Sequence, residues 1–451
     1  MTKGGIVMKK FAFLLIVLAF LVAACGGSSG STKVSEEPTK AATAVAETPT
    51  EDPPAPTALP QPTNTPEPTA TFEPTAQPED PLPDLTEALQ AIVDNWFSDN
   101  RLPGGAILEV DMPNYNYTFA GSVGMANPDT GDMLLPEDQF IISSMTKTFT
   151  AVTLLNLMEQ GLVNLDDSIG DYLPAELVDQ LLVIDGQSYG QQITVRQLLN
   201  HTSGLGDFSN GVDGNGNGLS DFKELVLAEP DTIWDETMVL AWDIENTPPV
   251  GMPGEQYVYS DTNYQLLGMI IEATSGMELP EAYRTLIFEP LGMSHTYFEF
   301  VEPVVEGVNG RPVSNAYYNR ILWNELDSHS YEWGSGGVVS TAPDLNRFLW
   351  AWANEELFAD PATQTEMTTW VTTPDCGTSY GLGLLRFVFA ECDIPGLGEN
   401  IGNAGLFNSF FFYWPEQNAT IIGTLNSNEP EFGFVGLPIE VMFTVLGFTG
   451  E

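Results

Sequence analysis

Basic residues are scarce in this chain of 451 residues, which has 14 Lys and Arg against 62 Asp and Glu and a formal charge of −48. Binding to duplex nucleic acid needs a basic surface, so we expect no nucleic-acid partner. The same charge disfavours attraction to anionic membrane surfaces. The hydrophobic content of 43% is typical of a globular protein, so the acidity does not indicate a disordered chain.

Lysine and histidine are especially rare beyond the N-terminus. Five of the seven lysines lie in the first 40 residues, which leaves only Lys147 and Lys223 in the rest of the chain. The three histidines, His201, His295 and His329, lack the spacing of zinc ligands. Any mechanism that needs a lysine or a histidine therefore has few candidates.

The N-terminal segment is typical of an export signal. Two lysines precede an unbroken apolar run, residues 11–24, which is shorter than the roughly 20 residues of a membrane span. The run ends in LVAAC at Cys25 and resembles the lipobox of bacterial lipoproteins, in which the cysteine is lipidated. We predict a lipoprotein signal peptide at residues 1–25 and an exported protein, lipid-anchored to the cell membrane through Cys25. An ordinary signal peptide is the alternative.

Composition then divides the rest of the chain. Residues 26–83 are rich in Pro, Thr, Ala and Glu and hold 13 of the 33 prolines, so they have little apolar surface to bury. We predict an extended, disordered stalk there and a folded domain over residues 84–451. An exported protein can keep a disulfide between Cys376 and Cys392. A long strand predicted between them argues against the pairing, which the sequence leaves open.

Hydrophobic periodicity predicts strands at both ends of the folded domain and helices in its middle. The predicted helices are 84–97, 143–160, 345–352 and 437–446, and the predicted strands are 105–110, 115–123, 380–389, 409–414 and 420–425. The middle, residues 165–330, consists mostly of helical segments and loops. This order predicts an α/β fold of the α+β type: a mixed, mainly antiparallel sheet flanked by helices, with an inserted, mostly helical lobe.

The strongest chemical motif is Ser144-Met145-Thr146-Lys147. Residues three apart share one face of a helix, so the Ser144 hydroxyl and the Lys147 amine would lie side by side. A serine hydroxyl is a weak nucleophile until a base takes its proton, and a buried lysine can act as that base. The motif arises by chance in many proteins, but Lys147 is one of only two lysines in the folded domain.

The surroundings of this motif, FIISSMTKTFTA at residues 140–151, resemble the nucleophile region of the serine beta-lactamase-related family. That family groups class C beta-lactamases, D,D-carboxypeptidases, D-aminopeptidases and some esterases. Five further segments match in order: ITVRQLLNHTSGL (193–205), YVYSDTNYQLLG (257–268), PLGMSHT (290–296), GSGGVVSTAPDLNRFL (334–349) and YGLG (380–383).

The resemblance implies a role for each matching residue. Ser144 would be the acylated nucleophile and Lys147 its partner. Tyr259 would match the tyrosine of the family's Tyr-x-Asn motif, with a pKa depressed by the lysine so that it relays protons. The oxyanion hole would consist of the backbone N–H of Ser144 and one near Leu406.

The sequence departs from the family in two places. Asp261 stands where the family usually has Asn, and an ionised carboxylate donates no hydrogen bond. Asn403-Ala404-Gly405 replaces the family's Lys/His-Thr/Ser-Gly, whose basic residue and hydroxyl help to hold a substrate carboxylate. Without that cation, and with 53 acidic against nine basic residues from Leu82 onward, we expect neutral or cationic esters and amides to be favoured over anions.

Two functions remain open from the sequence. The first is a serine hydrolase with an acyl-enzyme on Ser144 that cleaves esters or amides, of esterase, D-aminopeptidase or D,D-peptidase type. The second is a catalytically degenerate, penicillin-binding-like protein that only binds cell-wall peptide or a partner. Either way the partner is a small molecule or a peptide, and no organic cofactor is expected.

Other serines and histidines are weaker candidates. The pattern Gly-x-Ser-x-Gly occurs around Ser28, Ser188 and Ser379, but it works only as a strand–serine–helix elbow. Ser28 lies in the predicted stalk, Ser379 precedes a predicted strand, and Ser188 follows only a short apolar run. We expect His201 to form hydrogen bonds at a helix start and not to act as a base.

One acidic segment predicts a calcium loop. Residues 213–224, DGNGNGLSDFKE, fit the pattern D-x-[DN]-x-[DN]-G-x5-E of EF-hand-like loops in full. Six residues would supply side-chain or carbonyl oxygens to a structural calcium ion. They are Asp213, Asn215, Asn217, Leu219, Asp221 and Glu224. A flexible Asn-Gly loop is the alternative.

Overall fold

A computed structural model describes residues 84–449 of the chain. All of them belong to one compact unit. The predicted signal peptide (1–25), with its lipidation site Cys25, and the predicted stalk (26–83) lie outside the described residues.

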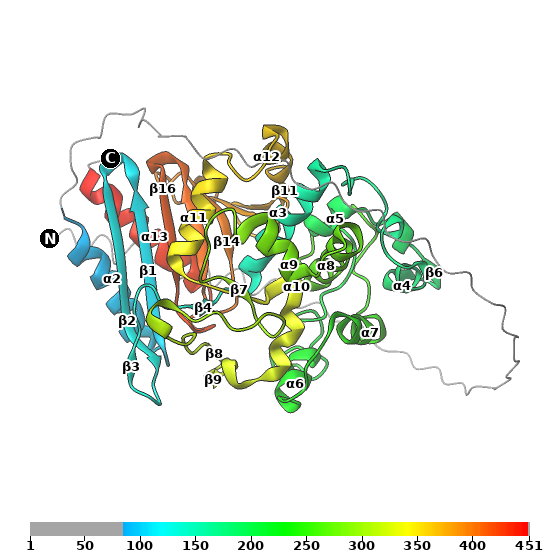
Figure 1. Cartoon of the computed structure of the whole chain (residues 1–451), viewed down its shortest axis with the longest axis horizontal. Coiled ribbons are helices and arrows are strands. Elements are labelled where there is room, and N and C mark those ends of the chain that lie inside the picture. The colour runs from blue at the N-terminus through cyan, green and yellow to red at the C-terminus, as the bar shows by residue number, and fades with distance from the viewer. Residues whose placement is uncertain (1–83, 450–451) are drawn as a thin grey trace, which may run out of the picture. The chain divides into compact units, whose positions relative to one another are not determined.

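A nine-stranded antiparallel sheet joins the two ends of the domain (Figure 1). Its order is β11-β12-β13-β14-β15-β16-β1-β2-β3, so the N-terminal hairpin pairs with the last strand. In that order the strands are Val371–Thr372, Thr378–Tyr380, Leu385–Val388, Glu399–Ala404, Phe410–Trp414, Ala419–Thr424, Gly105–Met112, Tyr117–Asn127 and Asp132–Met133. The mainly antiparallel sheet built from both termini is confirmed.

Side chains alternate between the two faces of this sheet, because successive residues of a strand point in opposite directions. In β15, Phe410 and Phe412 pack in the apolar layer beneath α2 (Thr86–Asn100) and α13 (Gly433–Thr449). Phe411 points to the other face, toward α11 (Ala342–Ala353) and the helical lobe. Each such buried phenylalanine contributes roughly 1.5–3 kcal/mol to stability.

The inserted lobe packs on that second face around α3 (Thr146–Glu159), which is buried on nearly every side. The apolar residues after Lys147 pack in the core, and the buried Thr148 and Thr150 donate hydrogen bonds to backbone carbonyl oxygens of Gly383 and Gly334. The other helices of the domain are α4 Ala175–Leu181, α5 Val195–Leu199, α6 Asp221–Ala228, α7 Glu236–Asn246, α8 Asp261–Ser275, α9 Leu279–Tyr283, the π-helix Arg284–Phe288, α10 Trp333–Gly336 and α12 Pro361–Met367.

Short strands interrupt this lobe, which is therefore less purely helical than predicted. Three of them form a small sheet in the order β4-β10-β7. They are Phe140–Ile141, Val338–Ser340 and Tyr297–Phe298, and two hairpins add β5 Val183–Ile184, β6 Gln187–Ser188, β8 Tyr317–Tyr318 and β9 Ile321–Leu322. The strand β4 leads directly into the segment that carries Ser144.

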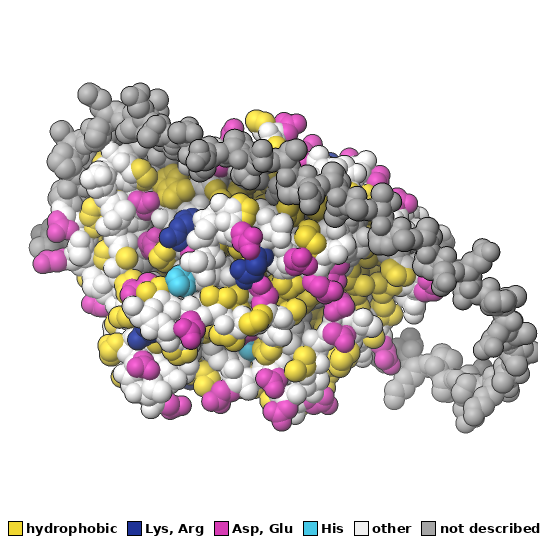
Figure 2. Space-filling model, in the orientation of Figure 1, with side chains coloured by type: hydrophobic (Ala, Val, Ile, Leu, Met, Phe, Trp, Pro, Cys, Tyr) yellow, Lys and Arg dark blue, Asp and Glu magenta, His cyan; other side chains and the backbone are white. Residues whose placement is uncertain are grey.

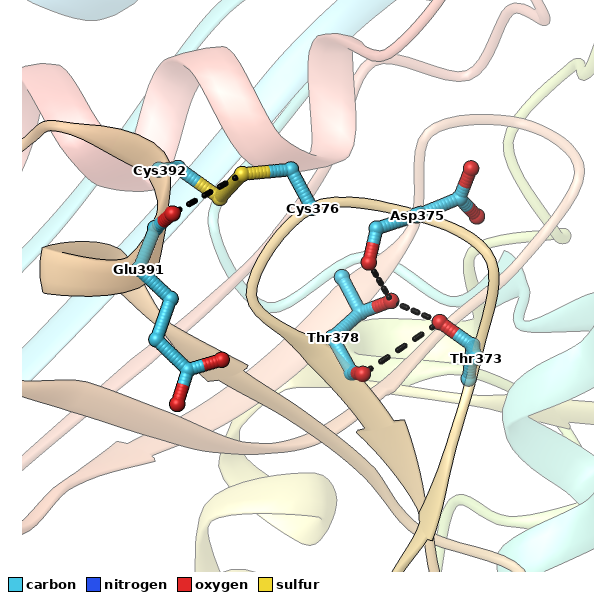
Figure 3. Close-up of a disulfide and its surroundings, with 6 residues drawn as sticks. All are labelled: Thr373, Asp375, Cys376, Thr378, Glu391 and Cys392. Carbon is cyan, nitrogen blue, oxygen red and sulfur yellow. Dashed lines mark hydrogen bonds between the residues drawn. A yellow bond between two sulfur atoms is a disulfide. The ribbon is translucent and has the colours of Figure 1, made fainter.

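The predicted long strand at 380–389 is wrong. It is the hairpin β12–β13, whose turn includes Gly383 with φ of +75°, a left-handed conformation that glycine adopts without strain. The hairpin brings Cys376 and Cys392 together in a disulfide with a Cα–Cα distance of 5.5 Å (Figure 3). The argument from a long strand against this pairing therefore fails.

Acidic side chains are spread over the face seen in Figure 2, where basic ones are few. None of the helices within residues 84–449 has the length and apolarity that crossing a membrane requires.

Candidate active site

Ser144 lies in a single 3-10 turn, Ser143–Met145, that leads into α3. The predicted helix 143–160 therefore begins with this turn, and its regular part starts at Thr146. Ser143 has a φ of +50°, an uncommon conformation for a residue with a side chain. Ser144 is partly exposed, whereas Lys147, one turn further on, is wholly buried.

The ammonium of Lys147 donates two hydrogen bonds and forms one ion pair. Its Nζ lies 3.0 Å from Ser144 Oγ and 2.8 Å from the carbonyl oxygen of Ser335 in α10. The ion pair joins Nζ to Oδ1 of Asp261, at 2.6 Å. The predicted contact between Ser144 and Lys147 is thus present, and the three partners fix the position of the lysine.

Tyr259 completes the contacts of Ser144. Its hydroxyl donates to Ser144 Oγ at 2.9 Å, and its ring faces the Lys147 ammonium with Nζ 5.0 Å from the ring centre. Burial, and next the carboxylate of Asp261, raise the pKa of Tyr259 well above its ordinary value. The expected depression of this pKa by Lys147 is therefore wrong: burial disfavours the charged phenolate, the Asp261 carboxylate adds to this effect, and the phenol keeps its proton at rest.

Asp261, the first residue of α8, departs from the family pattern and changes the charge of the site. It pairs with Lys147 and its backbone N–H donates to Oδ1 of Asp207 at 3.3 Å. Burial and the nearby Asp261 raise the pKa of Asp207 to about 6. A second buried carboxyl group therefore lies behind the Lys147–Asp261 pair.

His201 supports this arrangement from behind. Its imidazole stacks on Tyr259 with ring centres 4.4 Å apart, and its Nδ1 accepts from the backbone N–H of Ser260, the N-cap residue of α8. Burial and the charge of Lys147 hold the pKa of His201 well below its ordinary value, so the ring is neutral. The expected hydrogen bond at a helix start is confirmed, although His201 itself follows the end of α5.

The segment 403–406 meets Ser144 differently from the prediction. Asn403 is buried, and its Nδ2 donates to Thr148 Oγ1 at 3.0 Å, so it does not replace the family's cation at the pocket wall. Its Oδ1 accepts from the N–H of Ala404 at 2.8 Å. At Gly405, a Cβ atom would lie 2.2 Å from the Ile142 carbonyl oxygen, so only glycine lets this strand end approach the nucleophile turn.

A small pocket with a cavity volume of about 40 Å³ opens beside Ser144. Its wall consists of Ser143, Ser144, Ser209, Asn210, Lys223, Asp261, Tyr331, Glu332, Ser335, Gly336 and Leu406. Of the residues proposed for the oxyanion hole and substrate contact, it thus includes Asp261 and Leu406. Asn403, Ala404 and Gly405 are not part of this wall.

Sequence reasoning missed two charged residues of this pocket, Glu332 and Lys223. Burial raises the pKa of Glu332 to about 7, although Ser143 Oγ donates to its carboxylate at 3.1 Å. No pattern in the sequence pointed to Glu332. The scarcity of lysine could have drawn attention to Lys223, because it is one of the two lysines of the described domain and it lines the pocket.

The alternative Gly-x-Ser-x-Gly serines do not form nucleophile elbows. Ser188 ends the two-residue strand β6 and is exposed, and Ser379 lies within β12. Ser28 lies outside the described residues.

The predicted calcium loop folds around its own side chains. Asn215 Nδ2 donates to both carboxylate oxygens of Glu224, at 2.8 and 2.9 Å, and Asn217 Nδ2 also donates to Glu224. Asp213 accepts from the backbone N–H of Gly218 at 2.9 Å, a bond that heads the causes lowering its pKa.

The other predicted ligands of the loop lie nearby. Asp221 accepts from the N–H of Gly214 at 2.8 Å, and the N–H of Leu219 donates to Asn217 Oδ1 at 2.8 Å. Among residues 84–449, no three Asp, Glu, His or Cys side chains form a metal-binding group. Calcium binding therefore stays a prediction.

Comparison with known proteins places this geometry in a family. The family model described as Beta-lactamase matches residues 85–442. Penicillin-binding protein 4* of Bacillus subtilis (strain 168) is 30% identical over 258 residues, which are 54% of this chain and 49% of that protein. Protein flp of Staphylococcus aureus (strain NCTC 8325 / PS 47) is 26% identical over 219 residues, 48% of this chain and 39% of that protein. The chain thus spans half or less of the length of these relatives.

Solved structures agree with the fold. The D-stereospecific amidohydrolase from Streptomyces sp. superposes with a TM-score of 0.62 and 26% identity, over 77% of this chain and 95% of that one. The D-amino acid amidase from Ochrobactrum anthropi SV3 has a TM-score of 0.64 at 23% identity, over 81% and 98%. The family model covers most of the folded domain, including Ser144, Lys147 and Tyr259. The chain therefore belongs to the beta-lactamase family of serine hydrolases.

Proposed function

We propose that this protein is a serine hydrolase that forms an acyl-enzyme on Ser144 and cleaves esters or amides. One observation carries the proposal: Ser144 Oγ is hydrogen-bonded both to the Lys147 ammonium, at 3.0 Å, and to the Tyr259 hydroxyl, at 2.9 Å. A partly exposed serine held between a base and an acid, beside a pocket, is the arrangement that nucleophilic catalysis requires.

The charges of the site support a path for the proton of Ser144. Asp261 can take one proton from the Lys147 ammonium, and the neutral amine then takes the proton of Ser144 Oγ. Oγ attacks the carbonyl carbon, and the negative charge on the carbonyl oxygen meets the backbone N–H groups of Ser144 and Leu406.

The bond to the leaving group breaks as the leaving atom takes the proton of the Tyr259 phenol. The raised pKa of Tyr259 keeps the phenol protonated until this step. The Lys147–Asp261 pair, which holds the proton taken from Ser144, then reprotonates the Tyr259 phenolate. The net result moves the serine proton to the leaving group. Water hydrolyses the acyl-enzyme along the same route in reverse, and its proton returns to Ser144 Oγ.

The names of the similar structures support amides as one substrate class. The similar Streptomyces protein is named a D-stereospecific amidohydrolase, and the similar Ochrobactrum protein a D-amino acid amidase. Another similar structure, EstCE1, is described as a hydrolase with promiscuous acyltransferase activity, at a TM-score of 0.64 and 18% identity. We therefore propose D-amino-acid amides and peptides first and simple esters second.

Covalent labelling tests this function against a binding-only role. A fluorophosphonate probe should label Ser144, and p-nitrophenyl acetate should give a burst of p-nitrophenol, because acylation precedes the slower release of acid. Ser144→Ala should lose both signals, whereas Ser143→Ala, which changes the neighbouring hydroxyl, should still be labelled. Equal labelling of wild type and Ser144→Ala, or none of either, would contradict the proposed catalysis and favour a binding protein.

We also propose that the loop 213–224 holds a structural calcium ion. Its sequence fits the whole calcium-loop pattern, and the side chains of Asp213, Asn215, Asn217 and Glu224 already take part in one hydrogen-bond network. The loop runs into α6, which carries Lys223 to the pocket. An ion there would stabilise one wall of the active site.

The sequence alone supports the proposed location, an extracytoplasmic domain anchored through lipidated Cys25. Metabolic labelling with an alkyne fatty acid, followed by detergent phase partitioning, tests it. Wild type should carry the label and enter the detergent phase, and Cys25→Ser should do neither.

A further inference from the structure

The second lysine of the folded domain lies in the wall of the pocket beside Ser144. Lys223 belongs to α6 and lines the same pocket as Ser144 and Asp261. It is only 5% exposed, although an ammonium group ordinarily stays in water. The position of this cation therefore needs a physical explanation.

The described residues provide no ion pair for Lys223. Its Nζ donates to Oδ1 of Asn210 and lies 5.3 Å from the ring centre of Tyr318. Asn210 in turn donates to the carboxylate of Asp207 at 3.0 Å, so the nearest link to an acid passes through a neutral amide. None of the ion pairs found within residues 84–449 includes Lys223. One of its three N–H groups is left without a described acceptor.

The other charges of the pocket do not neutralise this cation. Lys147 and Asp261 form a pair of their own at 2.6 Å. Glu332 is the remaining acid of the wall, and burial raises its pKa to about 7, so it is largely protonated below neutral pH. A buried, unpaired charge is costly unless an opposite charge joins it.

We propose that Lys223 is the substrate-recognition residue of this pocket and binds a carboxylate of the substrate. This inference rests on the proposed hydrolase function and names its substrate class. A single carboxylate fits better than a phosphate dianion, because one ammonium balances one negative charge and the nearby Asp261 carboxylate repels a second one. Lys223 thus takes the part that the resemblance would have given to a basic residue at position 403.

The negative charge of the whole domain does not oppose this role. Charges separated by more than about 8–10 Å are largely screened at physiological salt, whereas a contact inside a pocket is not. The expectation that anions are disfavoured came from the missing basic residue at position 403 and from the summed charge. In the proposed role, Lys223 supplies a local cation that would reverse this expectation at the site.

Equilibrium binding to Ser144→Ala tests the proposal without requiring turnover. The probes are N-acetyl-D-alanine and its carboxamide, which differ only in the negative charge. We expect the acid to bind about tenfold more tightly than the amide, as a charge-assisted hydrogen bond to a buried ammonium predicts. Adding Lys223→Met, which keeps the length but removes the charge, should abolish that preference. Lys223→Arg should keep it.

A matched control uses the exposed Arg320, which pairs with Glu429 and is not part of the pocket wall. Ser144→Ala/Arg320→Met should keep the preference for the acid. An unchanged preference in the Lys223→Met protein, or no saturable binding of the acid to Ser144→Ala, would overturn the proposal. Circular dichroism and melting of each variant separate loss of the cation from loss of the fold.

Turnover gives the second readout. The carboxylate-bearing ester mono-p-nitrophenyl glutarate should have a higher kcat/KM than its methyl ester, and Lys223→Met should lower that ratio about tenfold or more. If Ser144 is not labelled by the fluorophosphonate but binding still depends on Lys223, the hydrolase proposal fails and the anion site stands. If labelling succeeds and the preference survives Lys223→Met, only the present inference fails.

Discussion

The ammonium of Lys147 and the carboxylate of Asp261 form an ion pair 2.6 Å long whose side chains are 1% and 10% exposed. The family resemblance leads one to expect an amide at position 261. The acid in its place neutralises the catalytic lysine at rest and supplies a group that can hold its proton. Catalysis in this chain should therefore depend on Asp261.

Replacing Asp261 with Asn should lower kcat/KM by about tenfold or more, because the Lys147 ammonium loses the carboxylate that takes one of its protons in the proposed path. Initial rates with p-nitrophenyl acetate between pH 5 and pH 9 measure the loss. Asp166→Asn, which removes an exposed acid outside the pocket wall, is the control and should leave kcat/KM unchanged. A kcat/KM unchanged by Asp261→Asn would argue against this account.

Tyr259→Phe should lower kcat/KM by about 10²- to 10⁴-fold, the usual contribution of a general acid. The ring that stacks on His201 is kept, so the melting temperature should change little. Tyr257→Phe is the matched control, because its ring also packs near His201, at 5.9 Å, and it makes no hydrogen bond to Ser144. Similar losses in the two variants would mean that Tyr259 acts through packing and not through its hydroxyl.

Glu332→Gln should remove part of the pH dependence of stability. Burial raises the pKa of Glu332 to about 7 in the folded state, whereas the unfolded chain releases this proton near the ordinary glutamate pKa of 4.5. The protonated Glu332 therefore stabilises the folded state fully below pH 4.5. This stabilisation, about 3 kcal/mol in all, is lost as the pH rises to 7. Between pH 4.5 and 8, the free energy of unfolding of Glu332→Gln should therefore rise by about 3 kcal/mol relative to that of wild type.

Urea unfolding at several pH values measures this difference. The exposed Glu356→Gln should follow the wild-type slope, since its carboxyl group lies at the surface. Parallel curves for wild type and Glu332→Gln would show that the carboxyl group of Glu332 ionises in the folded state as easily as in the unfolded chain.

The Cys376→Ser/Cys392→Ser variant should be less stable than wild type by about 3 kcal/mol. The disulfide joins residues 16 positions apart, and cross-linking a loop of that length restricts the unfolded chain by this amount. Urea unfolding of both proteins tests the prediction. A reducing agent should destabilise wild type and leave the double variant unchanged, and equal midpoints without reductant would contradict the role of the bond.

Calcium should raise the melting temperature of wild type and not that of Glu224→Gln, because position 12 of such a loop supplies both carboxylate oxygens. Millimolar concentrations are expected to be needed, since the loop has only three carboxylates. Glu229→Gln, at the end of the same helix and outside the loop, should respond like wild type. The same melting temperature of wild type in calcium and in chelator would contradict calcium binding by the loop.

The sequence alone determined the strands at the two ends, the helical middle and the nucleophile motif. These features depend on local periodicity and on spacing along one helix, so Ser144 and Lys147 could be placed side by side before any fold was known. The hairpin within residues 380–389 could not be predicted, because its turn depends on the backbone conformation of Gly383 and leaves no clear mark on the hydrophobic pattern. The pairing of Cys376 with Cys392 depends on that turn.

Only the tertiary structure decided what surrounds the nucleophile. Asn403 was expected at the substrate and is turned toward Thr148, whereas Glu332 and Lys223 reach the pocket although no motif assigned them to it. Charge and burial at a site depend on residues brought together from distant parts of the chain. The sequence could show that lysine is rare here, and the fold alone shows that Lys223 lines the pocket of Ser144, whose hydroxyl is hydrogen-bonded to Lys147.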